Sequence, residues 1–370
     1  MDHSIEMIVP PSLVQVRAIA NGSMLFGVQS MGEAFERRPN ALNGLRLGLA
    51  LVVLLWHSIL LTDRSWLSWP LHQLLEEVPV DAFFAVSGFL LARSWTKRPR
   101  ALEFALARAS RLLPGLWLCL ALTAAVIAPV VAPESTLRDR ATYALGNAGV
   151  YMSHRGLAED GQYLNLSLWS LWWECCCYAS MLVLGSRRAL TAATVAAIAC
   201  VLWSWLLVLT VAGVWSAIPG TLWVSAVPRL GLMFALGALI WLVRARVPVS
   251  GNLAAVASVV LFSSLLMPNY HLLGAPSVAY LCLWASLAVG ARRWARPNVD
   301  LSYGTYLYGF PLQVVLVRHG VDHWVPLTLA AAPLATAMAW ISWKACEAPA
   351  LRWMQEHRRP RRREPSGLST

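Results

Sequence analysis

Residues 42–61 read LNGLRLGLALVVLLWHSILL, an apolar run that contains two ionisable side chains, Arg46 and His57. An α-helix of about 20 residues is about 30 Å long, which matches the hydrocarbon thickness of a bilayer. Ionisable groups inside such a helix are costly and usually functional. The segment therefore predicts a membrane-spanning helix that carries two functional candidates.

The composition of the whole chain has the same character. The 370 residues are 58% apolar and only 13% charged, and the mean hydropathy is +0.55. Soluble domains usually contain about 45–50% apolar and about 25% charged residues. These values exclude a soluble, disordered or collagen-like chain and predict an all-α polytopic membrane protein, with the lipid bilayer as its principal partner.

The apolar segments divide into about ten predicted spans. They lie at roughly 42–61, 75–92, 112–131, 168–184, 190–210, 222–243, 250–267, 276–290, 301–317 and 325–343. With this division, most of the 30 Lys and Arg residues fall in loops on the side of the two termini. The positive-inside rule then predicts that both termini are cytoplasmic. The net charge of +11 is explained by this orientation, so we expect no nucleic-acid partner.

Arg46 and His57 are placed to face the same side of their helix. They are eleven residues apart in the sequence. Eleven steps of about 100° return to within about 20° of the starting direction, roughly 16 Å further along the axis. We predict that an anion held at Arg46 can extend an arm to His57.

Two carboxylates, Asp81 and Glu174, are predicted inside spans at the depth of His57, together with Arg229. A carboxylate beside a histidine fixes its tautomer and stabilises the imidazolium, which makes the other ring nitrogen a competent base. We therefore interpret His57 as the candidate base and Asp81 or Glu174 as its supporting acid. The alternative is a helix-packing network of these charges with no chemistry.

The predicted cytoplasmic segment before Pro114 carries Arg108 and Arg111. Side chains three residues apart lie on one helix face, so two guanidinium groups can converge on one phosphate. The alternative is simple positive-inside anchoring. The phosphate interpretation predicts a phosphorylated cytoplasmic ligand. The seven cysteines have no paired CxxC spacing, so we expect buried thiols and no metal site.

Six stretches of the chain resemble, in order, the motifs of the acyltransferase 3 family of integral membrane proteins. The first contains the Arg-x10-His signature of Arg46 and His57, and the third the Arg-x-x-Arg motif of Arg108 and Arg111. The stretches are 44–58 (GLRLGLALVVLLWHS), 80–90 (VDAFFAVSGFL), 108–114 (RASRLLP), 168–174 (LWSLWWE), 302–308 (SYGTYLY) and 347–352 (EAPALR). Ala82 and Cys175 depart from the usual residues, which affects fine specificity.

The resemblance implies transfer of a short acyl group, usually acetyl from acetyl-CoA, to a hydroxyl of a cell-surface or lipid-linked polysaccharide in the bacterial inner membrane. It implies that Arg46 and His57 are essential and that Arg108 and Arg111 serve the acyl-CoA. A proton-coupled secondary transporter is the rival interpretation, since it would use the same intramembrane charges as a proton relay. Paired unwound spans or inverted repeats would favour the transporter, and neither is evident.

The resemblance also divides the chain into parts. We expect residues 1–38 to be an N-terminal extension, either poorly ordered or upstream of the true start. Residues 39–352 form the predicted acyltransferase 3 transmembrane domain, and 353–370 a basic cytoplasmic tail. Many relatives carry an additional C-terminal hydrolase-like domain, which we do not expect here because the sequence ends soon after its last span.

Overall fold

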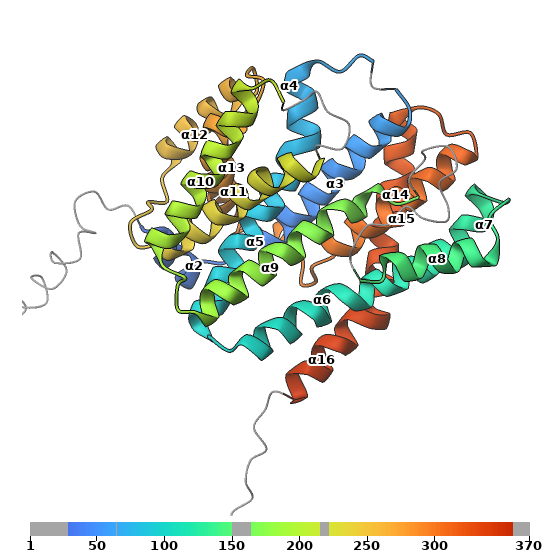
Figure 1. Cartoon of the computed structure of the whole chain (residues 1–370), viewed down its shortest axis with the longest axis horizontal. Coiled ribbons are helices and arrows are strands. Elements are labelled where there is room, and N and C mark those ends of the chain that lie inside the picture. Colours follow the sequence, from blue (N-terminus) through green and yellow to red (C-terminus); the bar gives the residue numbers. More distant parts are fainter. Residues whose placement is uncertain (1–28, 64, 150–163, 215–221, 358–370) are drawn as a thin grey trace, which may run out of the picture.

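The computed structural model of the chain describes residues 29–63, 65–149, 164–214 and 222–357, in which every regular element is a helix (Figure 1). The α-helices are α2 (Met31–Arg37), α3 (Leu42–Leu61), α4 (Trp69–His72), α5 (Val78–Lys97), α6 (Ala101–Leu122), α7 (Ala128–Val131), α8 (Leu137–Asn147), α9 (Trp169–Ser186), α10 (Ala192–Val211), α11 (Leu222–Leu242), α12 (Gly251–Ser264), α13 (His271–Ala288), α14 (Ser302–Arg318), α15 (Trp324–Ser342) and α16 (Ala348–His357). Short π-helical or 3₁₀ turns join some of them: η1 (Gln73–Glu77), η2 (Thr123–Ile127), η3 (Leu166–Leu168), η4 (Arg293–Ala295) and η5 (Trp343–Glu347).

All ten segments predicted as spans are helical, so the all-α class is confirmed. Six helices of the described residues are long and apolar enough to cross a membrane: Leu42–Leu61, Ala101–Val131, Ala192–Val211, Val224–Leu242, His271–Ala288 and Trp324–Met354. The count of ten spans and the side of the termini stay predictions. Both termini lie outside the described residues.

The N-terminal extension differs from expectation over its described part. Residues 31–37 form α2, which begins with a capping box in which the side chains of Ser30 and Glu33 each accept from the other's backbone N–H. Met31 and Phe35 are buried, and the Phe35 ring centroid lies 4.8 Å from that of Phe89 in α5. The ordered fold therefore begins before residue 39, because two apolar side chains of this segment join the core.

The centre of the molecule is the contact between α5 and α11. At Gly237 an added Cβ would lie 1.8 Å from the backbone oxygen of Ala85, and at Gly88 it would lie 2.0 Å from that of Phe234. Small residues of this kind let membrane helices approach until their backbones touch. On one side of this pair α13 and α10 pack against α11, and on the other α3 packs against α5, α14 and α15.

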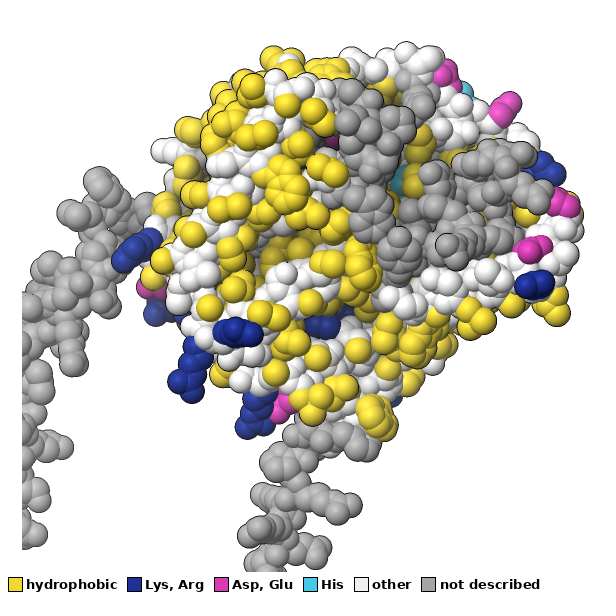
Figure 2. Space-filling model, in the orientation of Figure 1, with side chains coloured by type: hydrophobic (Ala, Val, Ile, Leu, Met, Phe, Trp, Pro, Cys, Tyr) yellow, Lys and Arg dark blue, Asp and Glu magenta, His cyan; other side chains and the backbone are white. Residues whose placement is uncertain are grey.

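The two ends of the helix bundle differ in charge. We call the end at which α3 begins the Arg46 side and the opposite end the His57 side. Figure 2 shows apolar side chains over the face formed by α9, α10 and α11, whereas Lys and Arg gather along the lower left edge, toward α2 and α6. Because α6 begins at the Arg46 side, the basic residues gather at that end of the bundle.

Candidate active site

Arg46 and Arg111 meet on one carboxylate at the Arg46 side. The Nη1 atom of Arg46 in α3 and the Nη2 atom of Arg111 in α6 both donate to Oδ2 of Asp300, in the connection before α14. The other oxygen, Oδ1, accepts from the backbone nitrogen of Ser302 at 3.1 Å and from its hydroxyl. Asp300 therefore ties three separate chain segments together.

The junction is largely shielded from solvent. The side chains of Arg46, Arg111 and Asp300 are 13%, 32% and 10% exposed. Burial raises the pKa of the Asp300 carboxyl, but the charges of Arg46 and Arg111 outweigh burial and hold the pKa well below its usual range. Asp300 is therefore a carboxylate at neutral pH, and each guanidinium uses only part of its five N–H donors on it.

A third guanidinium group, that of Arg108, lies beside this junction. Arg108 stands one turn before Arg111, with its guanidinium carbon 5.8 Å from the centroid of the Phe104 ring. Its Nε atom is buried without a hydrogen-bond partner among the described residues. Three guanidinium groups thus lie close together, with Asp300 and Glu174 as the carboxylates beside them, and guanidinium clusters of this kind suit an anion such as a phosphate.

The sequence predicted that Arg108 and Arg111 would converge on one ligand. In the structure Arg111 converges with Arg46, through Asp300, and Arg108 packs on Phe104. The phosphate interpretation of the cluster stays a prediction, with Arg46 and Arg111 as its central pair.

A small cavity adjoins Arg46 in the interior of the bundle. Its volume is about 40 Å³, enough for a few water molecules. Glu174 of α9 lines it and accepts a hydrogen bond from the Tyr178 hydroxyl. The cavity is lined by residues of the four helices α3, α5, α9 and α14: Arg46, Val80, Phe83, Phe84, Ser87, Ser170, Leu171, Glu174, Ser302, Tyr303 and Tyr306.

Two predicted site residues, Arg46 and Glu174, therefore share one cavity. The hydroxyls of Ser170 and Tyr306 also lie there, 2.8 Å apart. Sequence reasoning missed Asp300 and Tyr306. The repeated tyrosines in 302–308 were visible as a motif, but no pattern in the sequence marks which of them points inward.

His57 lies on the same side of α3 as Arg46. Its ring stands edge-on to Phe310 of α14 at a centroid distance of 5.0 Å, while Arg46 binds the carboxylate directly before α14. Arg46 and His57 thus share one side of α3, as their eleven-residue spacing predicted. The His57 side chain is buried at 5% exposure, and its ring makes no hydrogen bond to the described part of the chain.

The predicted support of His57 by Asp81 is not what the structure has. Asp81 is fully buried and accepts from Nε of Arg229 at 2.9 Å, from the Tyr270 hydroxyl and, at 2.7 Å, from Nε2 of His271. As the matched depth predicted, Asp81 pairs with an oppositely charged side chain, but its partners are Arg229 and His271. Nor does Glu174 contact His57, since its hydrogen bond goes to Tyr178.

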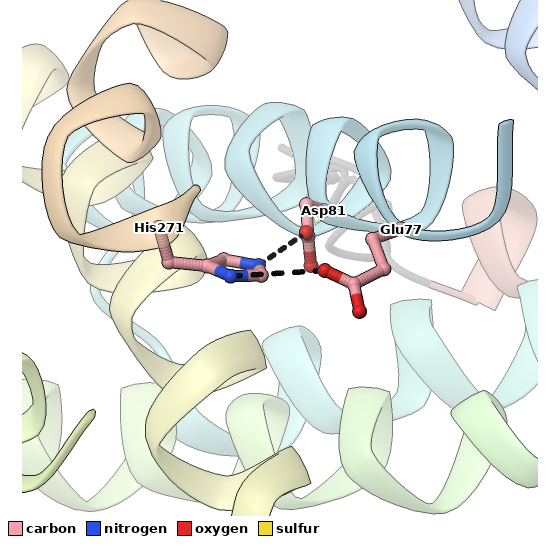
Figure 3. A group of neighbouring side chains, drawn as sticks. All are labelled: Glu77, Asp81 and His271. Carbon is pink, nitrogen blue, oxygen red and sulfur yellow. Dashed lines mark hydrogen bonds and ion pairs between the residues drawn. The ribbon is translucent and has the colours of Figure 1, made fainter. Parts of the chain in front are cut away.

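Figure 3 shows His271 of α13 pointing at two carboxylates, Asp81 and Glu77, of one helical stretch. The Nδ1 atom of His271 lies 2.8 Å from Oδ1 of Asn269 and 3.9 Å from a Glu77 oxygen. The side-chain amide nitrogen of Asn269 donates to the Thr210 hydroxyl, so the Asn269 oxygen is the atom that faces His271. Both His271 nitrogens therefore lie within hydrogen-bond distance of an oxygen atom.

One donor atom of each of Glu77, Asp81 and His271 falls within 4.8 Å of the others, a spacing that could hold a metal ion. The surrounding residues argue for an ion-pair network instead. Arg229 and Tyr270 already occupy the oxygens of Asp81. The Arg229 guanidinium lies 2.9 Å from Asp81 and 4.0 Å from Glu77, so both carboxylates already face a cation.

The fold and this site define a polytopic membrane protein with a buried cationic cluster beside a small polar cavity. Residues 40–344 match the acyltransferase domain of the acyltransferase 3 family. The chain belongs to this family, as its motifs indicated, and is an acyltransferase. No curated protein and no solved structure gives a significant match to it.

Proposed function

We propose that this acyltransferase moves an acetyl or other short acyl group from acetyl-CoA to a hydroxyl of a cell-surface or lipid-linked polysaccharide, in the inner membrane of a bacterium. The observation that carries the proposal is the cluster of Arg46, Arg111 and Arg108, in which Arg46 lies on the same side of α3 as His57. The cluster supplies an anion site for the donor's phosphates, and His57 supplies a base.

In this proposal Arg46 and Arg111 bind phosphate through the N–H groups that Asp300 leaves unused, and Arg108 adds a third cation. The acyl thioester then extends along α3 toward His57. The present cavity is too small for that arm, so its wall must move when the donor binds. The Asp300 junction includes Arg46 and Ser302, which line the cavity, so a phosphate that binds the junction acts directly on the cavity wall.

His57 takes the proton of the acceptor hydroxyl while the hydroxyl oxygen attacks the thioester carbonyl carbon. The C–S bond breaks as the C–O ester bond forms, and the imidazolium returns its proton to the departing thiolate. The products are an O-acyl sugar and free CoA, with no net proton released. Glu174 contributes a polar wall to the cavity beside Arg46, and Asp81 is assigned to helix packing.

The test is transfer of radiolabelled acetyl from acetyl-CoA to purified glycan in membranes. We expect His57→Ala to lower kcat by about 10²–10⁴-fold, the usual contribution of a general base. We expect Arg46→Ala to raise KM for acetyl-CoA. His319→Ala and Arg246→Ala are matched controls, because both residues are exposed.

Turnover of the His57→Ala variant at the wild-type rate would disprove the base assignment. Acetyl-CoA binding separates the enzyme from a secondary transporter. The enzyme should bind acetyl-CoA saturably and in competition with free CoA, whereas a transporter should not.

A further inference from the structure

A large apolar groove lies between α9, α10 and α11, outside the candidate active site. Its volume is about 710 Å³, within the range of pockets that hold sizeable ligands. Trp173 and Cys177 of α9, Leu202 of α10, and Leu230 and Phe234 of α11 are among its walls. No charged side chain of the described residues lines it.

The groove exists because two consecutive helices separate. Only the short turn at 187–191 joins α9 to α10, yet along their length these helices hardly pack on each other, and α10 packs on α11 instead. Small residues of α11 deepen the space on that side, at Ala226, Gly231 and Ala235. The gap is therefore built into the helix arrangement and does not depend on one side-chain rotamer.

The surroundings of the groove favour a hydrocarbon chain as its ligand. Both α10 and α11 are long and apolar enough to cross a membrane. Only 17% of the most apolar part of α10 is buried inside the protein, and apolar side chains such as Val201 and Val208 are exposed. A groove on this face meets lipid tails, and an apolar space of this kind does not hold water.

The groove and the catalytic cavity share α9 as a common wall. Ser170, Leu171 and Glu174 of α9 line the cavity, whereas Trp173 and Cys177 of the same helix line the groove. A chain lying in the groove thus runs beside the cavity with one helix between them. α9 ends at the Arg46 side, where Gly185 packs against Trp95 near the end of α5, so its N-terminal end points toward the His57 side.

We propose that the groove holds the hydrocarbon tail of a lipid-linked acceptor, whose head group leaves the groove at the N-terminal end of α9 and enters the cavity from the His57 side. This inference rests on the proposed function and specifies its acceptor as a lipid-carried glycan. The tail supplies binding energy in the membrane, and α9 sets how far the sugar stands from His57.

The first test is photolabelling of the full-length protein in vesicles with a polyprenyl phosphate that carries a diazirine in its tail. We expect labelled peptides from α9, α10 and α11, and competition by unlabelled polyprenyl phosphate but not by excess phosphatidylethanolamine. Labelling elsewhere, or equal competition by the phospholipid, would mean that the groove takes only bulk lipid and would overturn the proposal.

The second test fills the groove. Gly231→Leu projects into it toward Leu202, whose Cδ1 lies 3.1 Å from an added Cβ, and Ala235→Leu narrows it one turn further along. Val208→Leu is the matched control, because that side chain is 63% exposed on the outer face of α10. We expect both groove variants to lower photolabelling about tenfold, the scale of a few methylenes in an apolar pocket, and the control to leave labelling unchanged.

Transfer assays with two acceptors separate the two proposals. With a lipid-linked glycan the groove variants should lose activity, and with a water-soluble glycan they should keep the wild-type rate. His57→Ala should lose both. If labelling follows the groove variants but no acetyl transfer occurs even in the wild type, the proposed reaction fails and the lipid site stands. Equal loss with both acceptors would refute the role of the groove.

Discussion

At the scale of single residues, Asp300 is the side chain on which the anion site depends. Two guanidinium groups at close range repel each other unless a carboxylate lies between them, and Asp300 provides it with one oxygen while the other fixes the start of α14 at Ser302. Asp300 thus positions Arg46 and Arg111 without being the ligand. A phosphate would find both cations already oriented.

Replacing Asp300 by Asn tests this role, because an amide keeps the oxygen that caps Ser302 but loses the charge. We expect KM for acetyl-CoA to rise by about tenfold, equivalent to about 1.4 kcal/mol of donor binding, with kcat at saturating donor close to wild type. Steady-state kinetics measures both. Asp322→Asn, an exposed aspartate in the loop after α14, serves as control.

Two further observations decide between positioning and competition at Asp300. If the carboxylate acts through Arg111, the double change Asp300→Asn with Arg111→Met costs less than the sum of the single changes. A lower KM in Asp300→Asn would instead show that the carboxylate competes with the donor. Asp300→Glu should recover part of the wild-type affinity.

At the scale of helices, the network of Asp81, Arg229, His271 and Glu77 joins α11 and α13 to the continuous helical stretch of η1 and α5 at the His57 side. Removing one member of a buried ion pair leaves its partner charge uncompensated, which costs about 3–5 kcal/mol. We expect Asp81→Asn to lower the Tm of the purified protein strongly. The control Asp63→Asn changes an exposed loop carboxylate and should leave Tm within error.

The same variant separates packing from catalysis. If Asp81 acts through stability, molecules of Asp81→Asn that remain folded should turn over at a rate near wild type, and the pH profile of their turnover should be unchanged. If the folded variant instead turns over about a hundredfold more slowly than wild type, which is the effect expected for a catalytic acid, then Asp81 has a catalytic role.

The contact of α5 with α11 is the second feature at this scale. An added methyl at Gly237 would overlap the backbone of α5, and a backbone atom cannot move aside as a side chain does. We predict that Gly237→Ala destabilises the protein by about 3 kcal/mol or more, at or above the upper range for overpacking. The measurement is Tm in detergent. Gly48→Ala, where the structure leaves open space, should be tolerated.

The sequence predicted the helices better than it predicted the contacts between them. Hydrophobic length located ten segments that are helical in the structure, and the 3.6-residue period placed Arg46 and His57 on one side of α3. The contacts of Asp300 join residues 189 and 254 positions apart, and no local pattern reveals such pairs. Matched depth correctly grouped Asp81 with Arg229, but depth does not specify the lateral position of a helix, so it assigned Asp81 to His57 instead of His271.

At the scale of the whole molecule, the position of basic residues in loops predicts how the protein sits in the bilayer. Lys and Arg concentrate at the Arg46 side, where the α5–α6 connection carries Arg98 and Arg100, and the loop after α14 at the opposite side carries Asp322. Cytoplasmic loops retain positive charge. The same side holds the Arg46–Asp300–Arg111 junction, so the orientation would expose the proposed donor site to cytoplasmic acetyl-CoA.

We therefore predict that the Arg46 side is cytoplasmic. In a background with the seven native cysteines replaced by Ala or Ser, and shown to remain active, a membrane-impermeant maleimide should label Asp322→Cys in intact cells. Arg98→Cys should react only after the membrane is permeabilised. The reverse pattern would place the three guanidinium groups outside the cell, where acetyl-CoA is absent, and would contradict both the topology and the proposed donor site.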